Sequence, residues 1–309
     1  MSSISKSDRT SLTSISRLLL ACALLVPAGV TATLAQKAPN PAPTPAADAK
    51  GERIVSLGGD ATEILYALGL QDKIVAVDTT SLSPPQALKE KPNVGYMRAL
   101  SAEGVLSTGA TTIVANAQAG PPEVVNALKS AKLQFLSLPG NEDPHNVAAK
   151  VLIIGKAFGR EAEAKELAAR IEAGFKAVAE RREKIKKPVR AMFVLGVNNG
   201  RATVGGVGTT ADTMMKLAGA TNAADFKNYK PLTSEALISM APDVVITMRR
   251  QGATNNQTLL QSLPGYKETP AGKNGRLIEM DAHYLLGFGP RTHEAARELM
   301  SRLYPDLAK

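Results

Sequence analysis

The sequence predicts an α/β fold of two Rossmann-like lobes, each a parallel-rich sheet with flanking helices, joined by one long helix. Three observations support this: β-rich runs alternate with helical runs in residues 51–143 and again in 188–309, a proline-poor helical stretch fills 144–187, and the two halves share a similar segment. A chain of 309 residues with 44% hydrophobic and 21% charged residues can form two such cores.

The first lobe begins with a βαβ pattern. Arg53 to Leu57 is a short β-rich run, Gly58 and Gly59 form a turn, and Asp60 with Glu63 has the spacing of a capping box. The pattern predicts a helix that ends at Gly69, and further elements at 74–77 (strand), 112–115 (strand), 122–131 (helix) and 134–138 (strand). Short, continuously apolar strands of this kind are typical of a parallel sheet covered by helices.

The second lobe repeats this plan. We expect strands at 189–195, 244–248 and 276–280, a glycine loop at 205–208 and a helix at 210–217. The segment SAEGVLSTGATTIVAN aligns without a gap with TSEALISMAPDVVITM, and the alignment pairs Glu103 with Glu235. This internal echo indicates two lobes of one design.

The segment between the lobes predicts a single helix. Residues 145–186 keep a helical apolar period without an internal proline, and Pro188 is a plausible stop. At about 1.5 Å per residue, such a helix would span both lobes and leave a ligand cleft between them.

The N-terminus predicts export. Basic residues precede an apolar stretch and small residues precede Ala35, so we expect a signal peptide over 1–35 and a Pro/Ala-rich tether over 36–50. Cys22, the only cysteine, leaves a lipoprotein as the alternative. Loss of 1–35 removes three basic residues and one acidic residue, which lowers the formal charge from +9 to +7. Without a dense basic stripe, this charge does not indicate nucleic-acid binding.

The motifs favour binding over catalysis. No G-x-S-x-G nucleophile elbow occurs, the three histidines are scattered, and G-G-V-G-T-T lacks the lysine of a phosphate loop. In open α/β sheets, ligands bind beyond the carboxyl ends of the strands. The loops expected there include Gly58 to Asp60, the loop that carries Tyr96, and Asp281 to Arg291.

Four segments together carry a family resemblance: RIVSLGGDATEILYALG, VGYMRALSAEG, YKPLTSEAL and LGFGPRT. The chain from Arg53 to Pro305 resembles the haem-binding periplasmic proteins of bacterial ABC importers, class III binding proteins related to cobalamin and siderophore binders. The resemblance implies a periplasmic, monomeric, non-catalytic protein that takes ferric haem in the interlobe cleft and delivers it to an ABC transporter permease. A cobalamin or ferric-siderophore binder, and a secreted haem enzyme or sensor, are the alternatives.

The resemblance also implies roles for single residues. Tyr96 would be the axial ligand of the haem iron, since a phenolate favours Fe(III). Arg98 would lie beside that phenolate or pair with a haem propionate. Tyr229 and His283 are rival second ligands, and packing in the cleft wall is the alternative for Tyr229.

Other residues are candidates for the cleft and for docking. Arg291 in the GFGPRT segment, Arg249 and Arg250 are propionate candidates, and Gly58 and Gly59 are expected at the cleft. Glu103 and Glu235 resemble the pair of acidic residues that dock such proteins onto arginines of the permease. The alternative is that each glutamate only favours a helix N-terminus.

Overall fold

The computed structural model describes residues 51–141, 143–249 and 256–308. The predicted signal peptide (1–35), the predicted tether (36–50) and Arg250 lie outside these residues. In the described ranges, no helix is both long and apolar enough to cross a bilayer.

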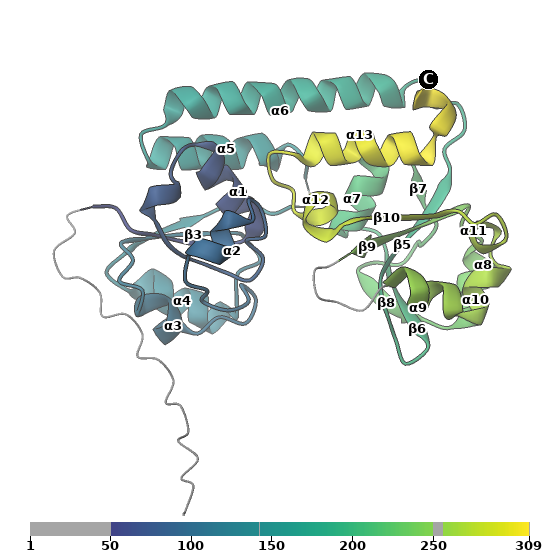
Figure 1. Ribbon diagram of the computed structural model, residues 1–309, viewed down its shortest axis with the longest axis horizontal. Helices are drawn as coiled ribbons and strands as arrows, with labels where there is room; N and C mark the ends of the chain where they lie inside the picture. The colour runs from purple at the N-terminus through teal and green to yellow at the C-terminus, as the bar shows by residue number, and fades with distance from the viewer. Residues whose placement is uncertain (1–50, 142, 250–255, 309) are drawn as a thin grey trace, which may run out of the picture. The chain divides into compact units, whose positions relative to one another are not determined.

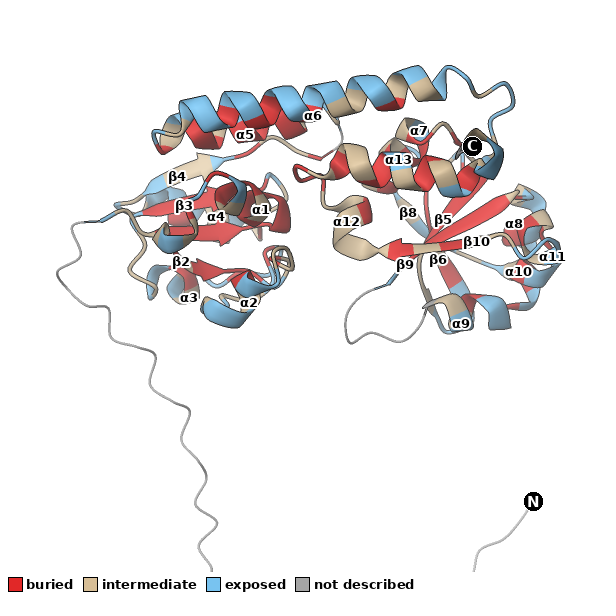
Figure 2. Cartoon of the chain, turned by 45° about the horizontal axis from the view of Figure 1, so that its top comes forward, coloured by how far each residue is buried: buried red, intermediate tan, exposed pale blue. Residues whose placement is uncertain are grey.

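The N-terminal lobe has a parallel sheet of the predicted kind (Figure 1). Its strands, in the order β2-β1-β3-β4, are β1 (Ile54–Leu57), β2 (Ile74–Val77), β3 (Thr112–Ala115) and β4 (Gln134–Ser137). Its helices are α1 (Gly59–Ala67), η1 (Gln71–Lys73), α2 (Gln86–Glu90), α3 (Ala102–Leu106) and α4 (Pro122–Ser130). The central strands β1 and β3 are buried throughout, as their continuous apolar sequences require (Figure 2).

The C-terminal lobe has a mixed sheet in the order β10-β9-β5-β6-β8. Strands β5 (Arg190–Asn198), β9 (Val244–Arg249) and β10 (Leu277–Asp281) are parallel and confirm the predicted strands. Strands β6 (Arg201–Gly205) and β8 (Tyr229–Leu232) are antiparallel additions, and β7 (Thr221–Asn222) pairs with β5. The helices are α7 (Thr210–Leu217), α8 (Ser234–Met240), α9 (Asn256–Ser262), α10 (Pro264–Glu268), α11 (Pro270–Lys273), α12 (Ala282–Leu286), α13 (Thr292–Leu303) and η2 (Pro305–Ala308).

The connecting segment contains two helices where one continuous helix was predicted. Helix α5 (Asn146–Ala157) packs on α1, and α6 (Glu161–Arg182) runs back along α5 and on to α7 and α13 of the second lobe. Gly159 lies between them at φ +64°, a conformation that favours glycine. A Cβ on Gly155 would lie 2.2 Å from that of Ala164, so glycine permits the close packing of the two helices. Helix α6, about 33 Å long, runs from α5 to the second lobe.

The predicted capping box at the start of α1 is wrong. Gly58 is the N-cap residue, at φ 122°, and no side chain caps the helix. Asp60 and Glu63 instead bond to residues far away in the sequence. One continuous hydrophobic cluster contains residues of both lobes, of α5 and of α6. This shared core brings α1 close to residues that are distant in the sequence, so Asp60 and Glu63 can bond to them.

Candidate functional site

The loop that carries Tyr96 lies at the carboxyl end of the N-terminal sheet. The amide of Val94 donates to the carbonyl of Val77, the last residue of β2, at 2.9 Å. On its other side, the loop exchanges backbone hydrogen bonds with Gly120, which donates to Met97 at 2.8 Å and accepts from Leu100 at 3.0 Å. The backbone of the loop is therefore held at the sheet edge where α/β folds bind ligands.

Tyr96 is exposed on this loop and has a cationic neighbour. Its side chain is 42% exposed, and its hydroxyl accepts a hydrogen bond from Arg98 Nη1 at 3.1 Å. Arg98 also donates to the Gln118 side-chain oxygen, just beyond β3, and its guanidinium lies 6.0 Å from the Tyr96 ring centroid. Both of these partners of Arg98 are neutral. Among the residues that the structure describes, no carboxylate pairs with Arg98, so the arrangement presents a phenol oxygen beside a positive charge.

Gly58 and Gly59 lie under this edge and are buried. The amide of Gly58 donates to Asp78 Oδ1 and that of Gly59 to Thr80 Oγ1, both at 2.9 Å. A Cβ on Gly59 would lie 2.3 Å from the ring of His283. The two glycines therefore allow a close approach of the second lobe, and both amides are already used inside the first lobe.

His283 and Arg291 converge on Glu63 of α1. Glu63 Oε2 lies 3.3 Å from His283 Nε2, and Glu63 Oε1 accepts from Arg291 Nε at 2.5 Å. Burial raises the pKa of the Glu63 carboxyl, but the hydrogen bonds from His283 and Arg291 outweigh burial and hold this pKa below its usual 4.5. Arg291 also donates to Ser83 Oγ at 2.8 Å. These two candidates thus bond to the first lobe, and this geometry favours a role in joining the lobes.

Lys150 of α5 forms a second joint between the lobes. Its side chain is fully buried, and its ammonium donates to Asp60 Oδ2 at 2.7 Å and to the carbonyl of Phe288 at 3.2 Å. Asn141 accepts from the same ammonium and donates to the carbonyl of Gly287 at 3.2 Å. The buried charge pair of one lobe therefore holds the LGFGPRT loop of the other.

The remaining ligand candidates have packing or surface roles. Tyr229 opens β8 opposite Gly205 of β6, where its ring packs against the core; a Cβ on Gly205 would lie 3.1 Å from it. Arg249 ends β9 and lies 3.6 Å from Glu279 in an ion pair. The geometry of Tyr229 thus fits the packing alternative.

Glu103 and Glu235 occupy the same place in the two lobes. Each is the second residue of a short helix, α3 or α8, and each is exposed. Each helix has a hydroxyl N-cap, Ser101 or Thr233, and leads into the strand that pairs with the first strand of its lobe. Hydrogen bonds from its own amide and from the Thr233 hydroxyl lower the pKa of Glu235.

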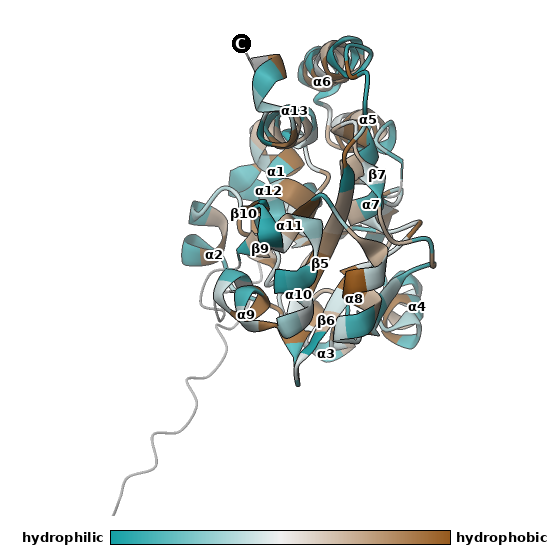
Figure 3. Cartoon of the chain, turned by 90° about the vertical axis from the view of Figure 1, so that its right-hand side faces the viewer, coloured by the Kyte–Doolittle hydropathy of each residue, from teal (hydrophilic) through white to brown (hydrophobic). Residues whose placement is uncertain are grey.

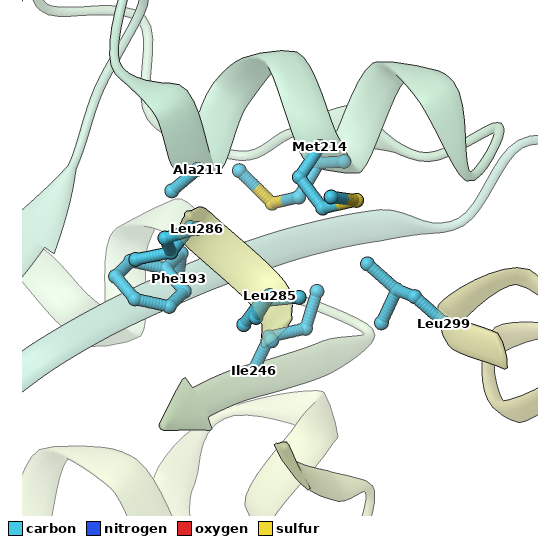
Figure 4. Close-up of a pocket in the computed structure, with 8 residues that line it drawn as sticks. Phe193, Ala211, Met214, Ile246, Leu285, Leu286 and Leu299 are labelled. Carbon is cyan, nitrogen blue, oxygen red and sulfur yellow. The ribbon is translucent and has the colours of Figure 1, made fainter. Parts of the chain in front are cut away.

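A small apolar void lies elsewhere, inside the C-terminal lobe (Figure 4). It is lined by Phe193, Ala211, Met214, Met215, Ile246, Leu285, Leu286 and Leu299. It has essentially no room for a water molecule, whereas sites that bind drug-sized molecules have volumes of roughly 300–1,000 Å³. We therefore regard it as a packing defect of the core.

The partner residues that were not predicted as such include Gln118, Glu63 and Lys150. Lys150 had a sequence signal, because it lies on the stripe formed by Val147, Val151 and Ile154, where a charged residue must find a buried partner. Glu63 was assigned to a cap because its spacing from Asp60 fits one. No local signal pairs Gln118 with Arg98, since the fold brings them together.

Comparisons with known proteins extend over both lobes. A family model described as a periplasmic binding protein matches residues 54–284. The solved structure of the periplasmic heme-binding protein RhuT from Roseiflexus sp. RS-1, in apo form, is 35% identical with a TM-score of 0.77 and covers 84% of this chain and 100% of its own. The periplasmic heme-binding protein BhuT in complex with two hemes is 36% identical with a TM-score of 0.77 and covers 83% and 99%. An uncharacterized ABC transporter substrate-binding lipoprotein of Bacillus subtilis (strain 168), YvrC, is 29% identical over 262 residues, which are 84% of this chain and 82% of that protein.

Proposed function

Since the chain belongs to the periplasmic binding protein family, we propose that it carries ferric haem through the periplasm to an ABC transporter of the inner membrane. The single observation that carries the proposal is the Tyr96 hydroxyl, exposed at the carboxyl edge of the sheet and bonded to Arg98. The similarity to RhuT and BhuT, both named as heme-binding proteins, supports haem over other cargo.

The chemistry of the pair fits a ferric cargo. A phenolate is a hard anionic oxygen donor, and tyrosine holds ferric haem iron in other proteins. A phenol loses its proton near pH 10 in water, so ligation at neutral pH needs neighbouring positive charge. The haem iron supplies one such charge and Arg98 supplies another. We therefore assign Tyr96 as the iron ligand and Arg98 as the group that stabilises its phenolate or a haem propionate.

His283 and Arg291 take a different role in this proposal. Both bond to Glu63, so their work is to hold the lobes together beside the haem rather than to contact it. Tyr229 packs in the C-terminal lobe. Tyr96 is then the protein's ligand to the iron.

Delivery requires a surface that the transporter recognises. We assign this role to Glu103 and Glu235, which present one carboxylate at the same position of each lobe. A permease built from two equivalent halves offers two equivalent basic sites, and a pair of acidic residues related by the internal repeat matches that arrangement.

The test is a visible-absorbance titration of the purified protein with ferric haem. Wild type should saturate with a high-spin, phenolate-type spectrum. Tyr96→Phe should lose that spectrum because it lacks the ligand oxygen. It should also bind haem at least about tenfold more weakly, a loss of about 1.4 kcal/mol of binding free energy. Tyr229→Phe tests the rival ligand and should keep the spectrum. Tyr66→Phe is a neutral control, because its buried hydroxyl has no hydrogen-bond partner among the described residues. Equal titrations of wild type and Tyr96→Phe would refute the ligand assignment.

A further inference from the structure

The two short helices that carry Glu103 and Glu235 are copies of each other in more than sequence. One turn on, Ser107 Oγ donates to the carbonyl of Gly104 at 3.0 Å, and Ser239 Oγ donates to that of Ala236 at the same distance. The aligned residues Val105 and Leu237 are both buried beneath their helices.

The ends of the two helices match as well. Gly109 has φ +64° and the aligned Ala241 has φ +44°, so both chains leave the helix through a left-handed residue. The alignment therefore describes two surfaces of the same local shape, one on each lobe.

Each surface exposes one large apolar side chain beside its glutamate. Leu106 is 42% exposed and Ile238 is 41% exposed. Each follows its glutamate by three residues and so lies on the same face of its helix. Figure 3 shows the strongly hydrophobic stretch of α8.

A single exposed leucine is ordinary and needs no explanation. Within the described ranges, however, only five large hydrophobic side chains are this exposed: Tyr96, Leu106, Leu152, Val207 and Ile238. Tyr96 belongs to the proposed haem site. Two of the other four, Leu106 and Ile238, occupy equivalent positions of the internal repeat. Unrelated substitutions on the two lobes do not account for that match.

We propose that Leu106 and Ile238 are contacts for the transporter, so that each lobe docks through one carboxylate and one apolar side chain. This inference rests on the proposed function, because it takes the permease dimer as the partner. The glutamates are acidic points on a chain of net charge +9 and therefore complement a basic partner. The apolar side chains complement an apolar recess next to each basic group. In this proposal the charges of Glu103 and Glu235 raise the association rate, and burial of Leu106 and Ile238 lowers the dissociation rate.

The experiment measures binding of the haem-loaded protein to the haem ABC transporter of the same organism, held in nanodiscs. Leu106→Gln and Ile238→Gln should each weaken binding about tenfold, as expected when a largely buried aliphatic side chain is replaced by a polar one. The effect should appear mainly in the dissociation rate and persist at 0.5 M salt. Glu103→Gln and Glu235→Gln should instead lower the association rate, and their effect should shrink as salt rises.

Leu152→Gln is the matched control, since Leu152 on α5 is equally exposed (41%) and has no counterpart in the repeat. It should bind the transporter like wild type, and all the variants should titrate normally with haem. If Leu106→Gln and Ile238→Gln bind like wild type while the glutamate variants fail, the apolar contacts are refuted and docking through the carboxylates stands. An equal loss in Leu152→Gln would also refute them. If wild type binds haem but not the transporter, the delivery function fails; if it does not bind haem, the carrier function fails.

Discussion

The hydrogen-bond partners of each arginine distinguish an arginine that can bind a ligand from one that stabilises the fold. Arg98 bonds to a phenol and an amide and, within the described ranges, to no carboxylate, so its charge is available to an anion. Arg291 bonds to the carboxylate of Glu63, which neutralises it, and Arg249 is paired with Glu279. Sequence motifs alone ranked Arg291 beside Arg98, because the GFGPRT segment does not reveal its partner.

Arg98→Gln should weaken ferric haem binding by roughly 10–100-fold, because a hydrogen bond to a charged group contributes about 1.5–3 kcal/mol. Arg98→Lys keeps the charge and should recover part of the loss. The measurement is the same absorbance titration, with Arg170→Gln as a control from an exposed surface pair. Unchanged affinity in Arg98→Gln would show that the positive charge beside Tyr96 has no part in binding.

At the scale of elements, the sequence predicts buried strands and amphipathic helices well and turns poorly. All seven predicted strands form, since short runs rich in β-branched residues and bounded by turn residues favour strands over helices. The hairpin between β5 and β6 was missed although Asn199-Gly200, with φ +49° and +70°, is a typical two-residue hairpin turn. Gly159 ended a helix that the absence of proline suggested was continuous. A glycine marked both the β5–β6 turn and the break between α5 and α6. The periodicity of apolar residues carries no information on such glycines.

Helix α8 ends in a left-handed residue that is not glycine. Ala241 occupies the left-handed region at φ +44°, where its counterpart in the other lobe, Gly109, pays no steric penalty. Ala241→Gly should raise the free energy of unfolding by up to about 1 kcal/mol, since relief of about 1–2 kcal/mol of strain exceeds the entropic cost of glycine, about 0.5–1 kcal/mol. Gly109→Ala should lower it by about 1 kcal/mol. Urea denaturation measures both, and a destabilised Ala241→Gly protein would contradict this account.

At the scale of the molecule, two polar joints connect the lobes. One is the buried Lys150–Asp60 pair with the carbonyl of Phe288, and the other is Glu63 with His283 and Arg291. These partners are separated by up to 228 residues, so no local pattern could predict them. The two lobes are therefore held together by α6 and by these specific side-chain contacts. The haem site proposed between the lobes requires a fixed position of Tyr96 relative to the second lobe, and these joints are the contacts that would hold it.

The second joint gives stability a defined dependence on pH. Glu63 has a folded-state pKa below the value near 4.5 expected when unfolded, so its stabilisation is complete above about pH 4.5 and is lost as the pH falls through the folded-state pKa. Glu63→Gln should therefore unfold more easily than wild type at pH 7, by about 1–3 kcal/mol, because the partners of the carboxylate lose a charged acceptor. The two proteins should converge in acid. Denaturant unfolding at pH 7 and at about pH 2, well below the unfolded-state pKa, tests this. Glu298→Gln is the control, since its exposed pair with Arg302 should contribute no more than about 1 kcal/mol. A stability gap that stays constant between these pH values would mean that the Glu63 carboxylate does not stabilise the joint through its charge.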